Sequence, residues 1–238
     1  MKTALVLSGG GMFGAWQAGA WRALAERFHP DLVVGASIGA LNGYAIAGGA
    51  SPQDLAQFWL RPDTARLRDL PKNIRDLMSH FSPRLEFAVV VTDVMRMKPK
   101  IFPGCEITWR HLAASCALPG VLPQRRIAGR WYSDGGLLNP LPAWAAVDLG
   151  ATKIVALHAL PKIPAAWLAH LARGFQRVWG HHPPLGAEVE LVLIQTGAPL
   201  GSLQDSIRWK RGNIERWMEM GFDAAKNISI PDCFHRAV

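Results

Sequence analysis

Cysteine is scarce in this chain and forms no pattern. The 238 residues include three cysteines, Cys105, Cys116 and Cys233. An odd number without C-x-x-C spacing argues against both a disulfide framework and a zinc site. We therefore expect buried thiols in a reducing compartment, and neither a metal nor an organic cofactor.

Long apolar runs are also missing. No segment approaches 18 uninterrupted apolar residues, so the sequence predicts no membrane-spanning helix. The apolar stretch after Lys2 is too short for the core of a signal peptide and is better interpreted as a first strand. Half of the residues are hydrophobic and 18% are charged, which is a globular composition. We expect a cytoplasmic protein with one domain over 1–238, and leave open peripheral contact with the inner membrane face.

Acidic residues are outnumbered by basic ones, which gives a net charge of +8. A basic balance suits an anionic partner, although scattered charges also serve ordinary solubility. No nucleic-acid recognition motif accompanies the charge, so we expect no nucleic-acid partner. Ten tryptophans are many, and tryptophan favours interfaces that are half apolar and half wet.

Apolar runs and helical patterns alternate along the chain, which predicts an α/β fold. Continuous apolar runs typical of buried parallel strands fall at 3–8, 31–37, 85–94, 152–160 and 189–196. Helical patterns fall at 14–28, 38–49, 108–117, 142–149, 165–179 and 204–223. Residues 52–84 contain no strand signal and predict a helical insertion over one edge of the sheet.

A glycine loop follows the first predicted strand. Gly9, Gly11 and Gly14 spell G-x-G-x-x-G, the dinucleotide-binding fingerprint. That function needs an acidic residue at the end of the second strand, where this chain has Ala36 and Ser37. The loop is therefore better suited to an oxyanion than to a pyrophosphate, because both need unhindered backbone N–H groups beside a helix N-terminus.

A serine lies between the second predicted strand and the following helix. Gly35, Ser37 and Gly39 form G-x-S-x-G, the pattern of a nucleophile on a sharp turn. The alternative is that Ser37 only caps a helix. A serine also needs a base, and His158 is the best placed histidine for a hydrolase triad. The glycine loop lies too close in sequence to Ser37 to match the lipase-type α/β-hydrolases.

A third feature is Asp134-Gly135-Gly136, which alone would be an ordinary turn. The glycine loop, the serine turn and the D-G-G sequence, in this order, resemble the patatin-like phospholipase family. The resemblance covers residues 3 to about 142 and includes the proline-containing segment 114–124. It implies a three-layer α/β/α fold with a mostly parallel sheet, and a Ser–Asp dyad.

The resemblance assigns Ser37 as nucleophile and Asp134 as general base. It implies an oxyanion hole from Gly9, Gly10, Gly11 and the N–H of Met12, with Gly14 letting the helix start close by. Gly35, Gly39, Gly135 and Gly136 support the motifs. Phe13 departs from the family, which usually has Arg or Lys at this position.

The implied function is hydrolysis of acyl esters of lipids, of the phospholipase A or lysophospholipase type. A soluble carboxylesterase or thioesterase with the same dyad, a catalytically silent binding protein and a nucleotide-binding oxidoreductase are the alternatives. Basic residues in 52–84 suit phosphate headgroups. The amphipathic pattern of 164–180 fits either a membrane surface or, as we favour, packing on the sheet.

Overall fold

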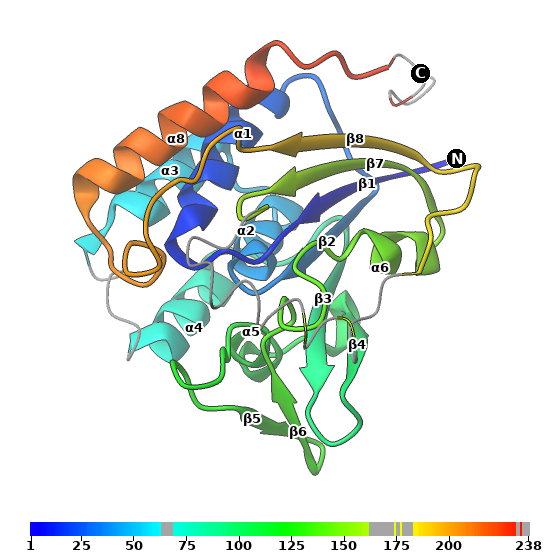
Figure 1. The fold of residues 1–238 in the computed structure, drawn as a ribbon, viewed down its shortest axis with the longest axis vertical. Coiled ribbons are helices and arrows are strands. Elements are labelled where there is room, and N and C mark those ends of the chain that lie inside the picture. The colour runs from blue at the N-terminus through cyan, green and yellow to red at the C-terminus, as the bar shows by residue number, and fades with distance from the viewer. Residues whose placement is uncertain (63–68, 162–173, 175–176, 178–182, 232–233, 235–238) are drawn as a thin grey trace.

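The computed structural model describes residues 1–62, 69–161, 174, 177, 183–231 and 234. One eight-stranded sheet forms the centre of the molecule (Figure 1). Its strand order is β5-β6-β3-β2-β1-β7-β8, with β4 also paired to β3. The strands are β1 (Lys2–Leu7), β2 (Leu32–Ala36), β3 (Glu86–Asp93), β4 (Lys98–Pro103), β5 (Arg125–Ile127), β6 (Arg130–Ser133), β7 (Ala151–His158) and β8 (Glu190–Gln195).

Five neighbouring strands are parallel, and the remaining three are antiparallel additions at one side. Strands β3, β2, β1, β7 and β8 run in the same direction. Strands β4 and β6 pair antiparallel with β3, and β5 pairs antiparallel with β6. The parallel centre follows from the continuous apolar runs, since strands covered on both faces are apolar throughout.

Helices cover both faces of the sheet. They are α1 (Gly14–Leu24), α2 (Ile38–Ala47), α3 (Pro52–Leu60), α4 (Leu70–His80), α5 (Trp109–Ser115), α6 (Ala143–Asp148) and α8 (Arg211–Lys226). Side chains of α1, α2, α3, α4 and α8 join one large core with alternate residues of the strands, and α6 packs in a second core on the opposite face. The predicted three-layer α/β/α fold is therefore confirmed.

Several elements differ from the sequence prediction. The insertion is helical, as predicted, and forms α3 and α4, whose buried side chains Leu55 and Ile74 join the large core on one face of the sheet. The short strands β4, β5 and β6 were not predicted. The last helix begins at Arg211, because residues 203–207 form an isolated turn. The predicted helix 165–179 falls almost wholly outside the described residues.

No helix in the described part of the chain is long and apolar enough to span a bilayer.

Helices α1 and α8 pack backbone against backbone through glycines. A Cβ atom on Gly221 would lie 1.9 Å from the carbonyl oxygen of Trp16. A Cβ atom on Gly19 would lie 1.8 Å from the carbonyl oxygen of Met218. Neither separation is possible for real atoms, so only glycine permits this crossing. The contact holds α8 against the helix that follows the glycine loop.

We predict that Gly221→Ala destabilises the protein, whereas Gly212→Ala in the same helix does not. The added methyl group at position 221 forces the two helices apart, which typically costs about 1–3 kcal/mol. No atom lies within 4 Å of a Cβ at position 212, so alanine there stabilises the helix by about 0.5–1 kcal/mol. Denaturant unfolding of both variants measures the difference, and equal effects would contradict the proposed crossing.

Candidate active site

Strand β3 aligns the two segments that carry Ser37 and Asp134. Strand β2 pairs with β3 up to Ala36 opposite Val90. Strand β4 occupies the other edge of β3 over the same stretch and beyond. Strand β6, which places Ser133 opposite Thr92, must therefore pair with the β2 edge, beyond the end of β2. Ser37 and Asp134 consequently approach from opposite directions toward the same point beside Val91.

Ser37 lies in a sharp turn between β2 and α2. Its backbone has φ 54° and ψ −130°, a conformation that non-glycine residues rarely adopt. Ser37 stands at the N-cap position of α2, but its side chain makes no capping bond to that helix. A Cβ on Gly39 would lie 2.4 Å from the carbonyl oxygen of Leu7, and one on Gly35 would lie 2.4 Å from that of Gly39. The two glycines are therefore required by close packing of strand, turn and helix.

The Ser37 side chain lies close enough to the Asp134 carboxyl group to lower the pKa of that carboxyl. The carboxyl Oδ1 also accepts a bond of 2.8 Å from the Gly136 N–H. The backbone of Asp134 is fixed from both sides, since its carbonyl accepts from Thr92 Oγ1 at 2.8 Å and its N–H donates to the Ala117 carbonyl at 3.1 Å. The structure therefore brings together Ser37 and Asp134, the serine and the aspartate that the sequence analysis predicted for the site.

Burial controls the ionisation of Asp134, which is 5% exposed. Desolvation raises its pKa from 3.8 to about 6, and the hydrogen bonds from Ser37 and the Gly136 N–H oppose that rise. A carboxylate with this pKa is still ionised at neutral pH, yet it binds a proton far more readily than an exposed aspartate. This property suits a group that must take and return a proton.

The glycine loop lies directly against Ser37. A Cβ on Gly9 would lie 3.3 Å from the Ser37 Cβ. Of the predicted oxyanion donors, the Gly9 N–H donates to the Pro140 carbonyl at 3.0 Å and the Met12 N–H donates to the Ser206 carbonyl at 2.8 Å. Within the described residues the N–H groups of Gly10 and Gly11 have no such partner. These two groups are thus the donors that the loop leaves for a ligand.

A buried polar network fixes the two ends of the loop. Gln17 on α1 donates to the Ser8 carbonyl at 2.8 Å. Asn42 on α2 donates to the carbonyl of Gly14 at 2.9 Å and to Gln17 Oε1 at 3.0 Å. Gly14 lies so close to α2 that a Cβ there would be 2.6 Å from Ile38 Cγ1. The network therefore ties the loop to the helix that follows Ser37.

Phe13, the departure from the family pattern, is fully buried. Its ring packs edge-on against Trp217 of α8, with 5.0 Å between the ring centroids. Since the side chain belongs to the core, position 13 places neither a charge nor a polar group at Ser37.

His158, the histidine that a triad would use, lies at the end of β7. Burial lowers its pKa to about 4, and its buried Nε2 has no hydrogen-bond partner among the described residues. The titratable carboxyl beside Ser37 is that of Asp134. His181, His182 and His235 lie outside the described residues. No group of three potential metal ligands occurs in the part of the chain that the structure describes.

Two residues of the site were not predicted, Ser115 and Cys116 at the end of α5. Ser115 Oγ accepts from the Ser37 N–H at 2.8 Å and donates to the Val90 carbonyl at 2.7 Å. Burial raises the pKa of the Cys116 thiol, and the nearby Ser37 side chain opposes that rise. Neither belongs to a pattern with known chemistry, and only their place in the segment 114–124 could have drawn attention to them.

We predict that Asp134→Asn stabilises the fold at pH 7. The raised pKa means that folding favours the neutral carboxyl, so wild-type stability is complete below about pH 4 and falls as the pH rises toward 6. A shift of about two pKa units corresponds to about 3 kcal/mol, which an uncharged amide avoids. Thermal unfolding should show a higher Tm for Asp134→Asn at pH 7 and a shrinking gap toward pH 4. The exposed Asp223→Asn on α8 is the control, and a gap that does not change with pH would contradict the assignment.

Comparison with known proteins agrees with this geometry. A family model described as patatin-like phospholipase matches residues 5–104 and 105–147. Patatin-like phospholipase domain-containing protein 7 of Rattus norvegicus is 31% identical over 65% of this chain and 13% of that protein. An uncharacterized NTE family protein of Mycobacterium tuberculosis is 29% identical over 72% of this chain and 56% of that protein. The chain therefore spans less than two thirds of the length of these relatives.

The fold has a counterpart among solved structures. VipD from Legionella pneumophila superimposes with a TM-score of 0.53 at 13% identity, covering 94% of this chain and 66% of that one. At this identity the likeness concerns the fold alone. The family model covers more than half of the chain and includes the glycine loop, Ser37 and Asp134, and on that ground the chain belongs to the patatin-like phospholipase family.

Proposed function

We propose that this protein is a serine acyl-ester hydrolase that acts on lipids, of the phospholipase A or lysophospholipase type. One observation carries the proposal: the Ser37 side chain lies close enough to the buried Asp134 carboxyl to lower its pKa, beside a loop whose Gly10 and Gly11 N–H groups have no partner among the described residues. A nucleophile, a base and oxyanion donors are the three parts that acyl transfer needs.

The proposed reaction has two steps. The Ser37 oxygen attacks the ester carbonyl and its proton passes to Asp134, while the N–H groups of Gly10 and Gly11 stabilise the oxyanion. The carbon–oxygen bond to the leaving alcohol then breaks, and Asp134 returns the proton to that alcohol. In the second step Asp134 takes a proton from the water that attacks the acyl-serine, and it returns this proton to the Ser37 oxygen as the bond to the acyl carbon breaks, which releases the acid and restores Ser37.

Family membership supports a lipid ester as substrate, and the name of the rat relative includes phospholipase. The same dyad would also serve a soluble carboxylesterase or thioesterase. The alternative of a catalytically silent binding protein rests only on the missing Arg or Lys at position 13, where the Phe13 ring packs against Trp217. Gly10 and Gly11 donate through their backbones, so they do not depend on a cation at position 13.

We predict that a fluorophosphonate probe labels the wild-type protein and does not label Ser37→Ala, because the probe needs an activated serine oxygen. Asp134→Asn should slow labelling by about 100-fold or more, the effect typical of removing a general base. Since the base acts as a carboxylate, the labelling rate of the wild type should fall with decreasing pH and reach half its maximum near pH 6. Labelling that persists in Ser37→Ala would refute the dyad.

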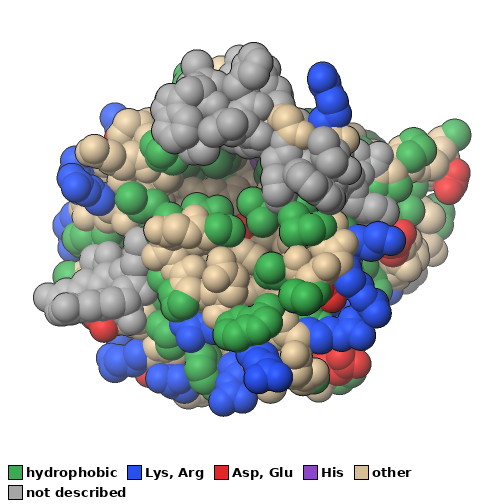
Figure 2. Space-filling model, turned by 60° about the horizontal axis from the view of Figure 1, so that its bottom comes forward, with side chains coloured by type: hydrophobic (Ala, Val, Ile, Leu, Met, Phe, Trp, Pro, Cys, Tyr) green, Lys and Arg blue, Asp and Glu red, His purple; other side chains and the backbone are tan. Residues whose placement is uncertain are grey.

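The protein also presents a face suited to a membrane surface, close to the proposed active site. Leu118, Val121 and Trp131 are 40%, 39% and 47% exposed. Leu118 and Val121 lie on the loop that leads from Ala117, the partner of the Asp134 N–H, into the β5–β6 hairpin, and Trp131 lies in β6. Figure 2 shows hydrophobic side chains gathered around a hollow at this end of the molecule.

Basic residues lie beside these apolar side chains and give the face a charge that suits anionic lipid. Figure 2 shows Lys and Arg side chains along its lower edge. The hairpin and the neighbouring β3–β4 segment, joined by a bond of 3.0 Å from the Val94 N–H to the Trp131 carbonyl, carry Arg96, Lys98, Lys100, Arg125, Arg126 and Arg130. We therefore propose peripheral contact through this face. The segment 164–180, predicted to be amphipathic, lies almost entirely outside the described residues.

We predict that Trp131→Ser combined with Arg126→Gln weakens binding to vesicles of mixed phosphatidylcholine and phosphatidylglycerol by about 10- to 100-fold. Each basic residue near an anionic surface contributes about 1 kcal/mol, and an inserted tryptophan adds to this. Flotation in the Ser37→Ala background avoids hydrolysis of the vesicles. The control combines Leu193→Ser on β8 with Arg211→Gln on α8, and a control that loses as much binding would disprove the assignment of this face.

A further inference from the structure

The loop between β8 and α8 reaches the glycine loop and contacts it through backbone atoms. The Ser206 carbonyl accepts the Met12 N–H at 2.8 Å. Gly11 has φ +57°, and a Cβ on it would lie 2.2 Å from the Ser206 carbonyl oxygen. Residues 200–210, which we call the support loop, therefore touch the glycine loop directly beside the two unpartnered N–H groups.

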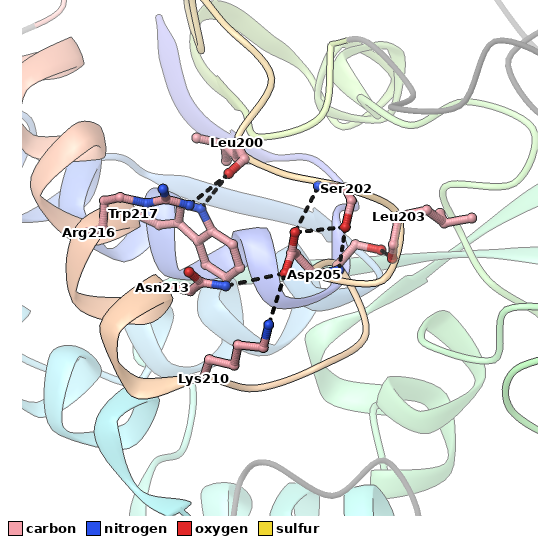
Figure 3. Close-up of polar contacts among 9 residues, drawn as sticks. Leu200, Ser202, Leu203, Asp205, Lys210, Asn213, Arg216 and Trp217 are labelled. Atoms are coloured by element: carbon pink, nitrogen blue, oxygen red, sulfur yellow. Dashed lines mark hydrogen bonds and ion pairs between the residues drawn. The ribbon is translucent and has the colours of Figure 1, made fainter.

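Asp205 holds the support loop in a single helical turn (Figure 3). Its Oδ2 accepts from the N–H of Ser202 at 2.9 Å and from Ser202 Oγ at 2.7 Å. Its Oδ1 accepts from Asn213 of α8 at 3.4 Å and lies 3.8 Å from Lys210 Nζ. One carboxylate therefore joins the beginning of the loop to the first turn of α8 and sets the position of the Ser206 carbonyl.

The start of the support loop is tied to α8 as well. The Leu200 carbonyl accepts from Trp217 Nε1 at 2.8 Å and from Arg216 at 3.3 Å (Figure 3). The Trp217 indole ring also packs against the Phe13 ring. Trp217 thus connects the support loop to the residue that follows Met12, so α8 reaches the glycine loop by two routes.

We propose that the support loop positions the oxyanion hole, with Asp205 as a positioning residue that acts through the Ser206 carbonyl. This inference rests on the proposed hydrolase function. Three consecutive glycines have a large conformational freedom, and donors stabilise an oxyanion only when their directions are fixed beforehand. The bond to Ser206 restricts the Gly11–Met12 peptide and so fixes the neighbouring N–H groups of Gly10 and Gly11.

The opposite role is also chemically conceivable, and it makes the opposite prediction. If the Ser206 carbonyl blocked the Met12 N–H as a third oxyanion donor, loosening the loop would increase activity. The geometry favours support, because Gly11 is packed against the Ser206 carbonyl and two N–H groups already remain for the ligand. The sign of the change in rate separates the two roles.

The test compares Asp205→Ala with Asp54→Ala. Ser51 and Asp54 form the same four-residue motif at the start of α3, with bonds of 3.0 Å and 2.7 Å to Asp54 Oδ2, and Asp54 makes no contact with the glycine loop. We expect Asp205→Ala to lower the rate constant of fluorophosphonate labelling about 10-fold, less than the 100-fold or more that removing an oxyanion donor costs. The fraction of protein finally labelled should not change.

Further measurements distinguish positioning from a loss of folding. With a soluble ester, kcat should fall about 10-fold while KM stays within about 2-fold, because the oxyanion forms only in the transition state. Asp205→Asn, which retains an acceptor for Ser202, should recover part of the rate. Asp54→Ala should behave as wild type in all these assays. A rate in Asp205→Ala equal to or above that of wild type would overturn the proposal.

Amide hydrogen exchange tests the same inference without catalysis. Release of the support loop should accelerate exchange of the Met12 N–H at least 10-fold in Asp205→Ala and leave it unchanged in Asp54→Ala. If the wild type does not react with the probe, the proposed hydrolase function fails, and the exchange at Met12 alone decides whether the support loop holds the glycine loop. Unchanged exchange at Met12 in Asp205→Ala refutes the support role in either case.

Discussion

The architecture of the site depends on the backbone of Ser37. A non-glycine residue at φ 54° is unfavourable by itself, so the surrounding structure must impose it. Gly35 and Gly39 allow β2, the turn and α2 to pack so closely that no side chain fits between them. The side chain of Ser37 is thereby directed out of the sheet, toward the segment that follows β6. A relaxed turn would leave the serine as an ordinary helix cap.

Parallel sheets place the ends of their strands at one edge, and here three antiparallel strands modify that edge. Strand β6 runs toward the end of β2. Asp134, which directly follows β6, therefore approaches Ser37 from the direction opposite to β2. An acid can therefore contact the serine without a histidine between them. The same approach buries the carboxyl group, and burial is what raises its pKa to about 6. The antiparallel course of β6 therefore accounts both for the position of Asp134 beside Ser37 and for the raised pKa of its carboxyl group.

The sequence pointed to the local parts of the candidate site, and to Asp134 only through the resemblance to the family. The serine turn and the D-G-G sequence each depend on neighbouring residues, since close packing and sharp turns demand glycine at fixed spacing. The parallel strands were found because burial on both faces requires continuous apolar runs. Strands β4, β5 and β6 were missed because short antiparallel strands with charged residues lack such runs. The bond from Met12 to Ser206 was missed for another reason, since a backbone carbonyl carries no signature of residue type.

The glycine loop combines two demands that conflict. Its N–H groups must be unhindered, which requires glycine, and they must also point in fixed directions, which glycine does not ensure. The structure resolves the conflict with bonds to the distant residues Pro140 and Ser206 and with the bond from Gln17, on the helix that follows the loop, to Ser8. Ser206 lies outside residues 5–147, which the family model matches. Trp217 of α8, against which the Phe13 ring packs, also lies outside that range. In this chain, therefore, one of the bonds that hold the glycine loop comes from a residue outside the part that the family model matches. A fragment that ends at residue 147 would contain Ser37 and Asp134 without that bond.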